Sequence, residues 1–500
     1  MVDDAQSARR ERVLTMGTKV NLNRSLHRRL LSMAAALAVA GGITTPTLRA
    51  GQANPATQPT FTKDIAPILQ RSCQNCHRPG SVAPMSLISY EEVRPWARSI
   101  KLKTSLREMP PWFLEKNVGI QRFKDDPSLS DEEIAKIAKW VDGGALRGDP
   151  ADMPPPRIFT DAAAWGIGTP DVVISSPVTI VKAVAPDQNI QLESSPMHLS
   201  DDRYIKAVEV KEVRLQEKTI QRVAGRGAGD LNYFVLHHAV IATERPQRET
   251  GPEFTNGRAP SSPGGFSMTR DSGGFSMTFE VGQNATIFPD DVGVVVAAGS
   301  VLTWDVHLHS IGKEVPVRID VAFKFHPKGY KPKYVQRTVQ MTLASQTDLD
   351  IPAGQDNVMV DGYHVVAQPA KMLTFEPHLH SSGKRMCAEV IYPNGYREIL
   401  NCSGYNHNWV KIYNYEDDVA PLLPAGTIIH LIAWYDNTSH NPRVVDPRNW
   451  KGFGSRSIDD MSTFLPRVVF LTDEDFKREV AARNTKLGPG GAATTARSKN

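Results

Sequence analysis

The stretch Phe375–Met386, FEPHLHSSGKRM, contains two histidines separated by one residue. In an extended strand, residues i and i+2 project from the same face, so His378 and His380 can point at a single ion. Leu379 then faces the opposite side of the sheet. The stretch therefore predicts a strand that supplies half of a metal site.

Two further histidine clusters precede this stretch. A second HLH motif stands at His307–His309, and an adjacent pair stands at His237 and His238. Consecutive residues of a regular strand face opposite ways, so the adjacent pair reaches one ion only at a bulge or at a strand end. Histidines on strands are more often structural than metal-binding, but three clusters in a β context favour metal binding. The remaining histidines of this region are interpreted as structural or as supporting residues around a site: His198, His364, His407, His430 and His440.

Short apolar runs separated by turns dominate the chain after about residue 160, which is typical of β-sandwiches. The runs are Asp171–Ile174, Tyr204–Val210, Tyr233–Ile241, Val292–Ala297, Leu302–Val306, Val315–Phe325, Ala388–Tyr392, Thr427–Tyr435 and Val468–Leu471. This part of the chain is too long for one sandwich, so we expect two that divide near Leu343–Ala353. Within the first, GGFSM occurs at Gly264–Met268 and again at Gly273–Met277. We interpret this piece as a flexible loop, with a transient copper contact through Met268 or Met277 as the alternative.

Residues 58–150 favour a compact helical unit instead. Ser130 and Glu133 have the spacing of a capping box at the start of a helix over Ile134–Val141. Upstream, Cys73-Gln-Asn-Cys76-His77 is the attachment signature of c-type haem, in which two thiols bond the haem and the histidine ligates the iron. A zinc site would need further Cys or His ligands nearby, and none occurs between His77 and His198. A thiol–disulfide motif would need a thioredoxin-like setting, which is absent.

The sixth haem ligand is expected to be a methionine of the same unit, either Met85 or Met109. The unit resembles the cytochrome c-like domains of large bacterial secreted oxidoreductases. The matching elements are Cys76–Gly80, Tyr90, Trp96, Met109–Trp112 and Trp140–Gly144. This resemblance implies that Met109 is the axial ligand, in a loop stiffened by prolines. Met85 is the alternative.

The N-terminus predicts export. Four basic residues, Lys19, Arg24, Arg28 and Arg29, precede an apolar run, Leu30–Ile43, that is too short to cross a bilayer comfortably. We therefore expect a cleaved signal within residues 1–50 and a location in the bacterial periplasm or outside the cell. No later run of eighteen apolar residues follows, so no integral membrane span is expected in the mature protein. Lys and Arg number 58 against 54 Asp and Glu, which gives no basic field for nucleic acid.

The other two cysteines flank a hairpin signal. Cys387 lies seven residues before Asn394, and Cys402 lies seven residues after Gly395. Counting outward from that turn places them opposite one another, so a cross-strand disulfide is geometrically reasonable in an exported protein. Two buried thiols are the alternative, because the register of a hairpin can slip by one residue.

The β region resembles the copper type II, ascorbate-dependent monooxygenases, the family of peptidylglycine alpha-hydroxylating and dopamine beta-monooxygenases. The matching segments, in the order of the family, are Phe234–Ile241, Asp305–Ser310, Pro377–Lys384, Asp436–Pro442 and Ser457–Met461. The resemblance implies one copper in each sandwich. It implies the ligands His237, His238 and His307 for the first copper and His378, His380 and Met461 for the second. His309 stands beside His307 in the motif, so which of the two ligates stays open.

The chemistry of Met461 supports copper separately. A thioether is a soft ligand that suits Cu(I) and is a poor partner for zinc or calcium, whereas imidazole accepts both copper oxidation states. The alternative is a buried methionine that caps a loop. Asp459 and Asp460 stand before the methionine, where the family has Asp-Glu or Glu-Glu.

The expected fold class is multidomain: a small all-α cytochrome c-like domain followed by two all-β copper domains of the jelly-roll or β-sandwich type. The expected divisions are a signal region 1–50, a haem domain 58–150, a linker 151–160, an N-terminal sandwich 161–346, a C-terminal sandwich 347–475 and a disordered tail 476–500.

The resemblance implies an exported copper monooxygenase that hydroxylates a C–H bond of a small organic substrate with O2. His378, His380 and Met461 would hold the copper at which O2 reacts, and the other copper would supply the second electron. The cofactors would be two copper ions, one covalent c-type haem, and ascorbate or another external reductant. The haem would be an electron inlet, fed by ascorbate or by a redox protein.

Two other functional classes are alternatives. A non-catalytic carrier would use the haem and the copper sites to move electrons or metal. A secreted zinc hydrolase would use the HxH sites, but the sequence shows no carboxylate beside these histidines and gives Met461 no role in it.

Overall fold

A computed structural model describes residues 58–487, except residues 80, 82, 84, 160–164, 187, 216–234, 245–274, 281–284, 345–347, 455 and 457. The expected signal region, Met268 and residues 488–500 lie outside the described residues. Within the described part, strands outnumber helices and form sheets consistent with β-sandwiches. No described helix is long and apolar enough to cross a membrane.

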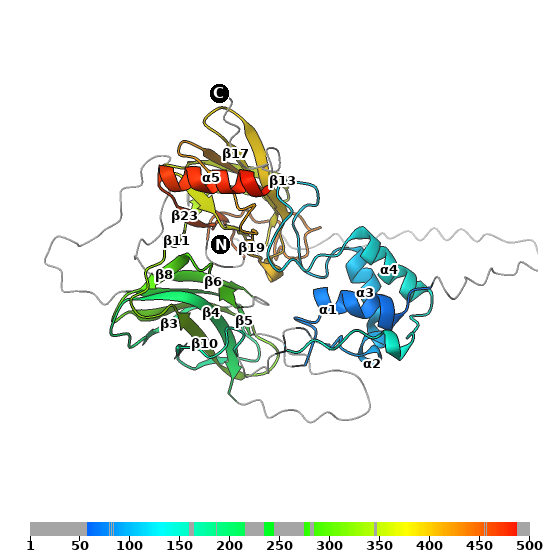
Figure 1. The fold of residues 1–500 in the computed structure, drawn as a ribbon. Coiled ribbons are helices and arrows are strands. Elements are labelled where there is room, and N and C mark those ends of the chain that lie inside the picture. Colours follow the sequence, from blue (N-terminus) through cyan, green and yellow to red (C-terminus); the bar gives the residue numbers. More distant parts are fainter. Residues whose placement is uncertain are drawn as a thin grey trace, which may run out of the picture. The chain divides into compact units, whose positions relative to one another are not determined.

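The helices before residue 153 lie close together (Figure 1), and most of them contribute to one hydrophobic core. They are η2 (Phe61–Ile65), α1 (Ala66–Ser72), α2 (Tyr90–Val93), η3 (Arg94–Trp96), α3 (Ala97–Ser105), α4 (Asp131–Asp142) and η4 (Pro150–Asp152). The predicted capping box at the start of α4 is confirmed, because Ser130 accepts from the Glu133 amide and Glu133 accepts from the Ser130 amide. Trp140 on α4 is fully buried against Phe61 and donates its indole N–H to the Leu146 carbonyl at 2.9 Å. This core is separate from those of the sandwiches.

The first sandwich contains β1 (Val172–Ser175), β2 (Thr179–Val181), β3 (Gln188–Pro196), β4 (Arg203–Arg214), β5 (Leu236–Glu244), β6 (Ser276–Glu280), β7 (Thr286–Ile287), β8 (Val292–Val296), β9 (Val301–Leu308) and β10 (Val315–Phe325). One sheet has the order β3-β9-β5-β6, and β1, β10, β4 and β8 are neighbours in the other. Alternate residues of β9 and β10, such as Trp304, Val306 and Phe323, fill the core between them. Met277 on β6 also lies in that core, and its side chain is only 5% exposed. The assignment of Met277 to a flexible loop is therefore wrong. Phe275 and Phe279 on either side are buried too, and β6 includes Ser276 and Met277 at the end of the second GGFSM copy.

The second sandwich contains β13 (Asp356–Val365), β14 (Ala370–Met372), β15 (Thr374–Phe375), β16 (Pro377–Leu379), β17 (Gly383–Ile391), β18 (Arg397–Gly404), β19 (Tyr413–Asn414), β20 (Leu422–Leu423), β21 (Ile428–Asp436), β22 (Ser462–Phe464) and β23 (Arg467–Phe470), with η6 (His407–Trp409) after β18. Its larger sheet has the order β13-β21-β17-β18, and β14 lies between β23 and β20. Every apolar run read from the sequence in both sandwiches overlaps a strand.

The two sandwiches share main-chain pairing. Strand β11 (Tyr334–Thr338) pairs with β8 in parallel and with β23 in antiparallel fashion, so one sheet continues from the first sandwich into the second. Strand β12 (Met341–Thr342) pairs with β22. The residues just before the expected division therefore belong structurally to both sandwiches.

The segment 112–124, between α3 and α4, packs against the second sandwich. Ile120 and Phe123 are buried in its core, and the Trp112 and Tyr413 rings lie 4.8 Å apart. The Ile120 amide donates to the Leu400 carbonyl at 2.9 Å, and Asn401 donates its side-chain amide to the Ile120 carbonyl at 2.6 Å. The sequence assigns this segment to the helical unit, but its apolar residues complete a β core.

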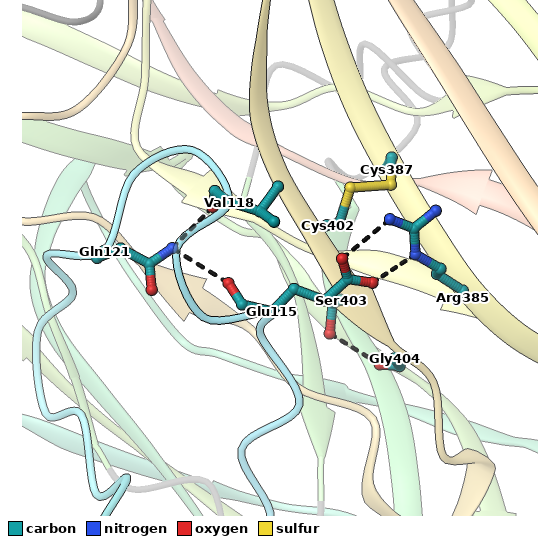
Figure 2. Close-up of a disulfide and its surroundings, with 8 residues drawn as sticks. All are labelled: Glu115, Val118, Gln121, Arg385, Cys387, Cys402, Ser403 and Gly404. Carbon is teal, nitrogen blue, oxygen red and sulfur yellow. Dashed lines mark hydrogen bonds and ion pairs between the residues drawn. A yellow bond between two sulfur atoms is a disulfide. The ribbon is translucent and has the colours of Figure 1, made fainter. Parts of the chain in front are cut away.

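The disulfide expected between Cys387 and Cys402 is confirmed. The two cysteines are paired residues of β17 and β18, with Cα atoms 4.1 Å apart. Figure 2 shows this bond beside the ion pair that Arg385 of β17 makes with Glu115 of the segment 112–124.

Residues 473–487 form helix α5 (Asp473–Leu487), so the prediction of a disordered tail from residue 476 is wrong for this part. Phe476 and Val480 pack on a small apolar cluster that includes Leu422 and Val469. Arg483, 5% exposed, donates to the Ala420 carbonyl at 2.6 Å. The helix is mostly charged, so its few apolar residues give a weak amphipathic signal.

Candidate metal centre

A bulge in β5 brings the adjacent histidines together. Strand β5 pairs with β9, but the register shifts between Leu236, which is opposite Leu308, and His238, which is opposite His307. Strand β5 therefore has one more residue than β9 at His237, the geometry of a β-bulge. The expectation that adjacent histidines need a bulge to share a site is confirmed.

Three histidines meet at this bulge. The ligand nitrogens of His237, His238 and His307 all lie within 4.8 Å of one another. Nδ1 of His238 is 3.1 Å from Nδ1 of His237 and 3.2 Å from Nδ1 of His307. His309 lies outside that group, although its ring centroid is 4.5 Å from that of His237.

The environment keeps His238 neutral. Burial, and then the neighbouring histidines, hold the pKa of His238 well below its usual range. His237 and His307 are 7% and 1% exposed. A neutral imidazole offers a lone pair to a metal, so this group of three is equipped to hold an ion.

Strand pairing brings the chain next to Met461 close to the second histidine pair. Strand β16 carries His378, and His380 follows its end; β22 pairs with β16 so that Leu379 is opposite Ser462 and His378 is opposite Thr463. His380 and Met461 are the next residues beyond this register. If the register were continued by one step, the thioether and both imidazoles would project to the same face.

Asp460 holds the segment after β16 and the residue before β22 together, a role that its position in the sequence does not reveal. Its carboxylate is fully buried and accepts from the amides of His380 at 3.0 Å, Ser382 at 3.1 Å and Met461 at 3.0 Å. It also accepts from the Ser382 hydroxyl. One side chain therefore ties the histidine strand to the methionine.

His378 and His380 are also held in the neutral form. Burial, and then His380, lowers the pKa of His378 to about 3. Burial is also the main cause that lowers the pKa of His380 to about 4. Hydrogen bonds with the backbone of Arg456 and Asp459 raise this pKa, but by less than burial lowers it. Nδ1 of His380 is buried and has no hydrogen-bond partner among the described residues. An imidazole held by backbone through one nitrogen, with the other unpaired, matches a metal-ligating histidine.

The two histidine groups adjoin. The ring centroids of His238 and His378 are 6.4 Å apart. His407, which the sequence analysis set aside, lies between the groups, with its centroid 5.6 Å from that of His237 and 5.4 Å from that of His380. Its position could not be predicted from spacing, because it has no partner histidine nearby in the sequence.

A carboxyl group also stands beside these histidines. Glu280 on β6 is the cross-strand partner of His238 on β5 and is 3% exposed. Burial, and then Glu376, holds the pKa of Glu280 well above its usual range. The ligand atoms that gather here belong to His237, His238 and His307 and not to Glu280, so the expectation that no carboxylate ligand accompanies these histidines stays a prediction.

The CxxCH motif lies between α1 and α2. Cys73 and Cys76 are free and partly exposed, and His77 donates its Nδ1–H to the Met85 carbonyl at 3.2 Å. Met109 lines a cavity of 520 Å³ together with Trp112, Leu129 and Ile134. Cys73, Cys76 and His77 are not among the residues that line this cavity.

No family model and no curated protein matches this chain. Among solved structures, the empty top component of cowpea mosaic virus is 10% identical with a TM-score of 0.27, covering 61% of this chain and 92% of the viral chain. PNGF-II is 8% identical with a TM-score of 0.24, covering 60% of this chain and 65% of its own. Likenesses this weak carry no argument about function.

Proposed function

We propose that this chain is an exported copper monooxygenase that hydroxylates a C–H bond of a small organic substrate with O2. The observation that supports the proposal is the pairing of β16 with β22, a register that would set Met461 opposite His380 if it were continued by one step. This donor set of two imidazoles and a thioether adjoins a second set of three imidazoles. Such sets suit copper in both of its oxidation states.

The residues fit copper in three respects. His237, His307 and His380 are buried, low pKa values keep His238, His378 and His380 neutral at physiological pH, and Nδ1 of His380 has no partner among the described residues. Copper, when bound, would supply one-electron redox chemistry with O2. The chain would orient the ligands through Asp460 and exclude water through the buried walls of the two sandwiches.

We further propose that residues 58–150 form a cytochrome c-like domain whose haem is attached through Cys73 and Cys76. His77 fits the iron ligand, because its bond to the Met85 carbonyl leaves Nε2 for the metal.

The test is metal content followed by O2 consumption. The purified mature chain should bind two copper ions and, when reduced with ascorbate, consume O2 only with a productive substrate from a panel of small organic compounds. Met461→Ile should abolish substrate-dependent O2 consumption. Met359→Ile is the matched control, because Met359 is 60% exposed on β13 and should leave the rate unchanged.

The same measurements address the alternatives. A carrier would bind copper without substrate-dependent O2 consumption. A zinc hydrolase would contain zinc after purification and would tolerate Met461→Ile.

The proposed role of the haem, to receive electrons and pass them to the copper ions, has its own test. In the copper-loaded chain, reduced haem should be reoxidised by O2 faster than in the copper-free chain. Equal rates in both forms would reject the inlet and leave the oxygenase standing.

A further inference from the structure

His407 has the surroundings of a ligand and not of a structural histidine. It is 7% exposed, and neither Nδ1 nor Nε2 has a hydrogen-bond partner among the described residues. His430 shows the ordinary arrangement, since its two nitrogens lie 3.0 Å from Glu389 and 3.0 Å from Asp361. Burying two unpaired polar atoms costs free energy unless something else binds them.

The rings around His407 lie at distances that one ion can span. Two imidazoles on one ion, with metal–nitrogen bonds of about 2.0–2.1 Å, have ring centroids about 4.5–6 Å apart. The His407 centroid is 5.4 Å from His380 and 5.6 Å from His237. The histidines already assigned to one site have the same spacing: 5.4 Å for His378 and His380, and 5.2 Å for His237 and His307.

The local chain explains how the ring reaches this position. His407 begins η6, the short turn that follows β18, and Tyr405 before it is anchored by its hydroxyl to the Leu379 carbonyl between the two histidines of the HLH stretch. The amide of Tyr405 also donates to the Lys384 carbonyl at 2.7 Å. The turn is therefore fastened to the strand that carries His378.

We propose that His407 is a copper ligand that joins the second site beside His380 and, through its contact with His237, makes the two histidine groups one continuous metal-binding cluster. This inference rests on the proposed function for the identity of the metal.

The test compares variants at position 407 by copper binding. His407→Gln removes the imidazole, and His407→Phe keeps a ring of similar volume without nitrogen. The mature, haem-containing chain is dialysed against buffered Cu(I) at a series of free concentrations, and bound copper is counted by mass spectrometry. Both variants should bind the second copper at least tenfold more weakly than the unaltered chain. The EPR spectrum of the Cu(II) form should also show hyperfine coupling to one nitrogen fewer at the second copper.

His364→Gln is the matched control. His364 is also partly buried, but its Nε2 is 3.0 Å from the Thr342 carbonyl and it is no member of the cluster, so copper binding should not change. Circular dichroism and the melting temperature of each copper-free variant report whether it folds. If His407 only fills space in the core, the His407→Phe variant should bind copper as tightly as the unaltered chain does.

The outcomes separate the two proposals. If the unaltered chain binds two copper ions and both position-407 variants match it in affinity and EPR spectrum, the role of His407 is refuted and the monooxygenase stands. If the unaltered chain binds no copper, the proposed function itself fails. Weaker binding in both variants, with His364→Gln unchanged, supports the inference.

Discussion

At the scale of residues, spacing in the sequence predicts only ligands that share a strand. His378 and His380 alternate with Leu379, so the period of a β-strand brings them to one face. Asp460, Glu280 and His407 reach the same region from other parts of the chain, and no local pattern marks them. Long-range strand pairing and buried hydrogen bonds position these residues.

Asp460 should be a positioning residue for the second site. Asp460→Asn replaces one acceptor oxygen of the buried carboxylate by a donor, so the amides of His380, Ser382 and Met461 cannot all stay paired. We expect the free energy of unfolding to fall by about 1–3 kcal/mol in urea titrations. The second copper should also bind more weakly, a change that a purely structural role would not produce. Asp459→Asn, which removes an exposed pair with Arg456, should change little; an equal loss in both variants would refute this role.

The buried histidines should make the metal-free protein sensitive to acid. The pKa values of His378 and His380 are depressed to about 3 and 4 in the folded chain, below their usual value of 6.5. Between these values and 6.5 the unfolded chain binds more protons, so stability rises with pH across this window. Urea denaturation of the copper-free chain should give a lower free energy of unfolding at pH 5.0 than at pH 7.5.

The control for this pH dependence is a histidine outside the cluster. His380→Phe should reduce the difference between the two pH values, whereas His440→Ala, at an exposed position, should not. An unchanged difference in His380→Phe would show that other groups cause it.

At the scale of elements, alternation and turn residues predict the strands well. The run Val315–Phe325 coincides with β10, and the hairpin count predicts the disulfide partners. Helix α5 is missed, because charged residues dominate it and its apolar contacts are few. Pairings between distant strands, such as β16 with β22, do not follow from either strand alone.

The disulfide should stabilise the second sandwich. Cys387 and Cys402 enclose a sequence separation of 15 residues, for which the loss of loop entropy in the unfolded chain corresponds to about 3 kcal/mol. The double variant Cys387→Ala, Cys402→Ala should therefore unfold at a lower urea concentration. Dithiothreitol should destabilise the unaltered chain and leave the double variant unaffected. A dithiothreitol effect of the same size on the double variant would contradict this role.

Helix α5 should be needed for folding of the second sandwich. A chain that ends at Thr472 loses Phe476 and Val480 and exposes Leu422, Val469 and Leu471. We expect a lower melting temperature and increased binding of a hydrophobic dye. A chain that ends at Leu487 keeps the helix and should match the full-length protein. If both truncated chains melt alike, the helix contributes nothing.

At the scale of the whole molecule, boundaries between folding units do not coincide with changes in sequence pattern. The segment 112–124 lies between two helices in the chain but contributes Ile120 and Phe123 to a β core. Likewise, β11 pairs with strands of both sandwiches. Local pattern predicts the class of each region, whereas these connections depend on tertiary packing.

Phe123→Ala should destabilise the second sandwich and not the helical core. Truncation of a buried phenylalanine costs about 3–5 kcal/mol. Hydrogen exchange measured by mass spectrometry should show faster exchange in β18 and β19. Phe61→Ala is the matched control, because Phe61 belongs to the helical core and should speed exchange in α1 and α4 instead. The same exchange pattern in both variants would mean that the two cores unfold together.

The metal site depends on the number of residues in β5, because the bulge at His237 adds one residue to this strand relative to β9. Loss of one codon between His238 and Glu244 would shift the remaining residues to opposite faces of the sheet and move Ala239 and Ile241 out of the core. Such a deletion would change no ligand, yet it would remove the offset that turns His237 and His238 to one side. In genetic terms, this short stretch should tolerate substitutions at the exposed Val240 and almost no insertion or deletion, so gaps in alignments of related chains should avoid it.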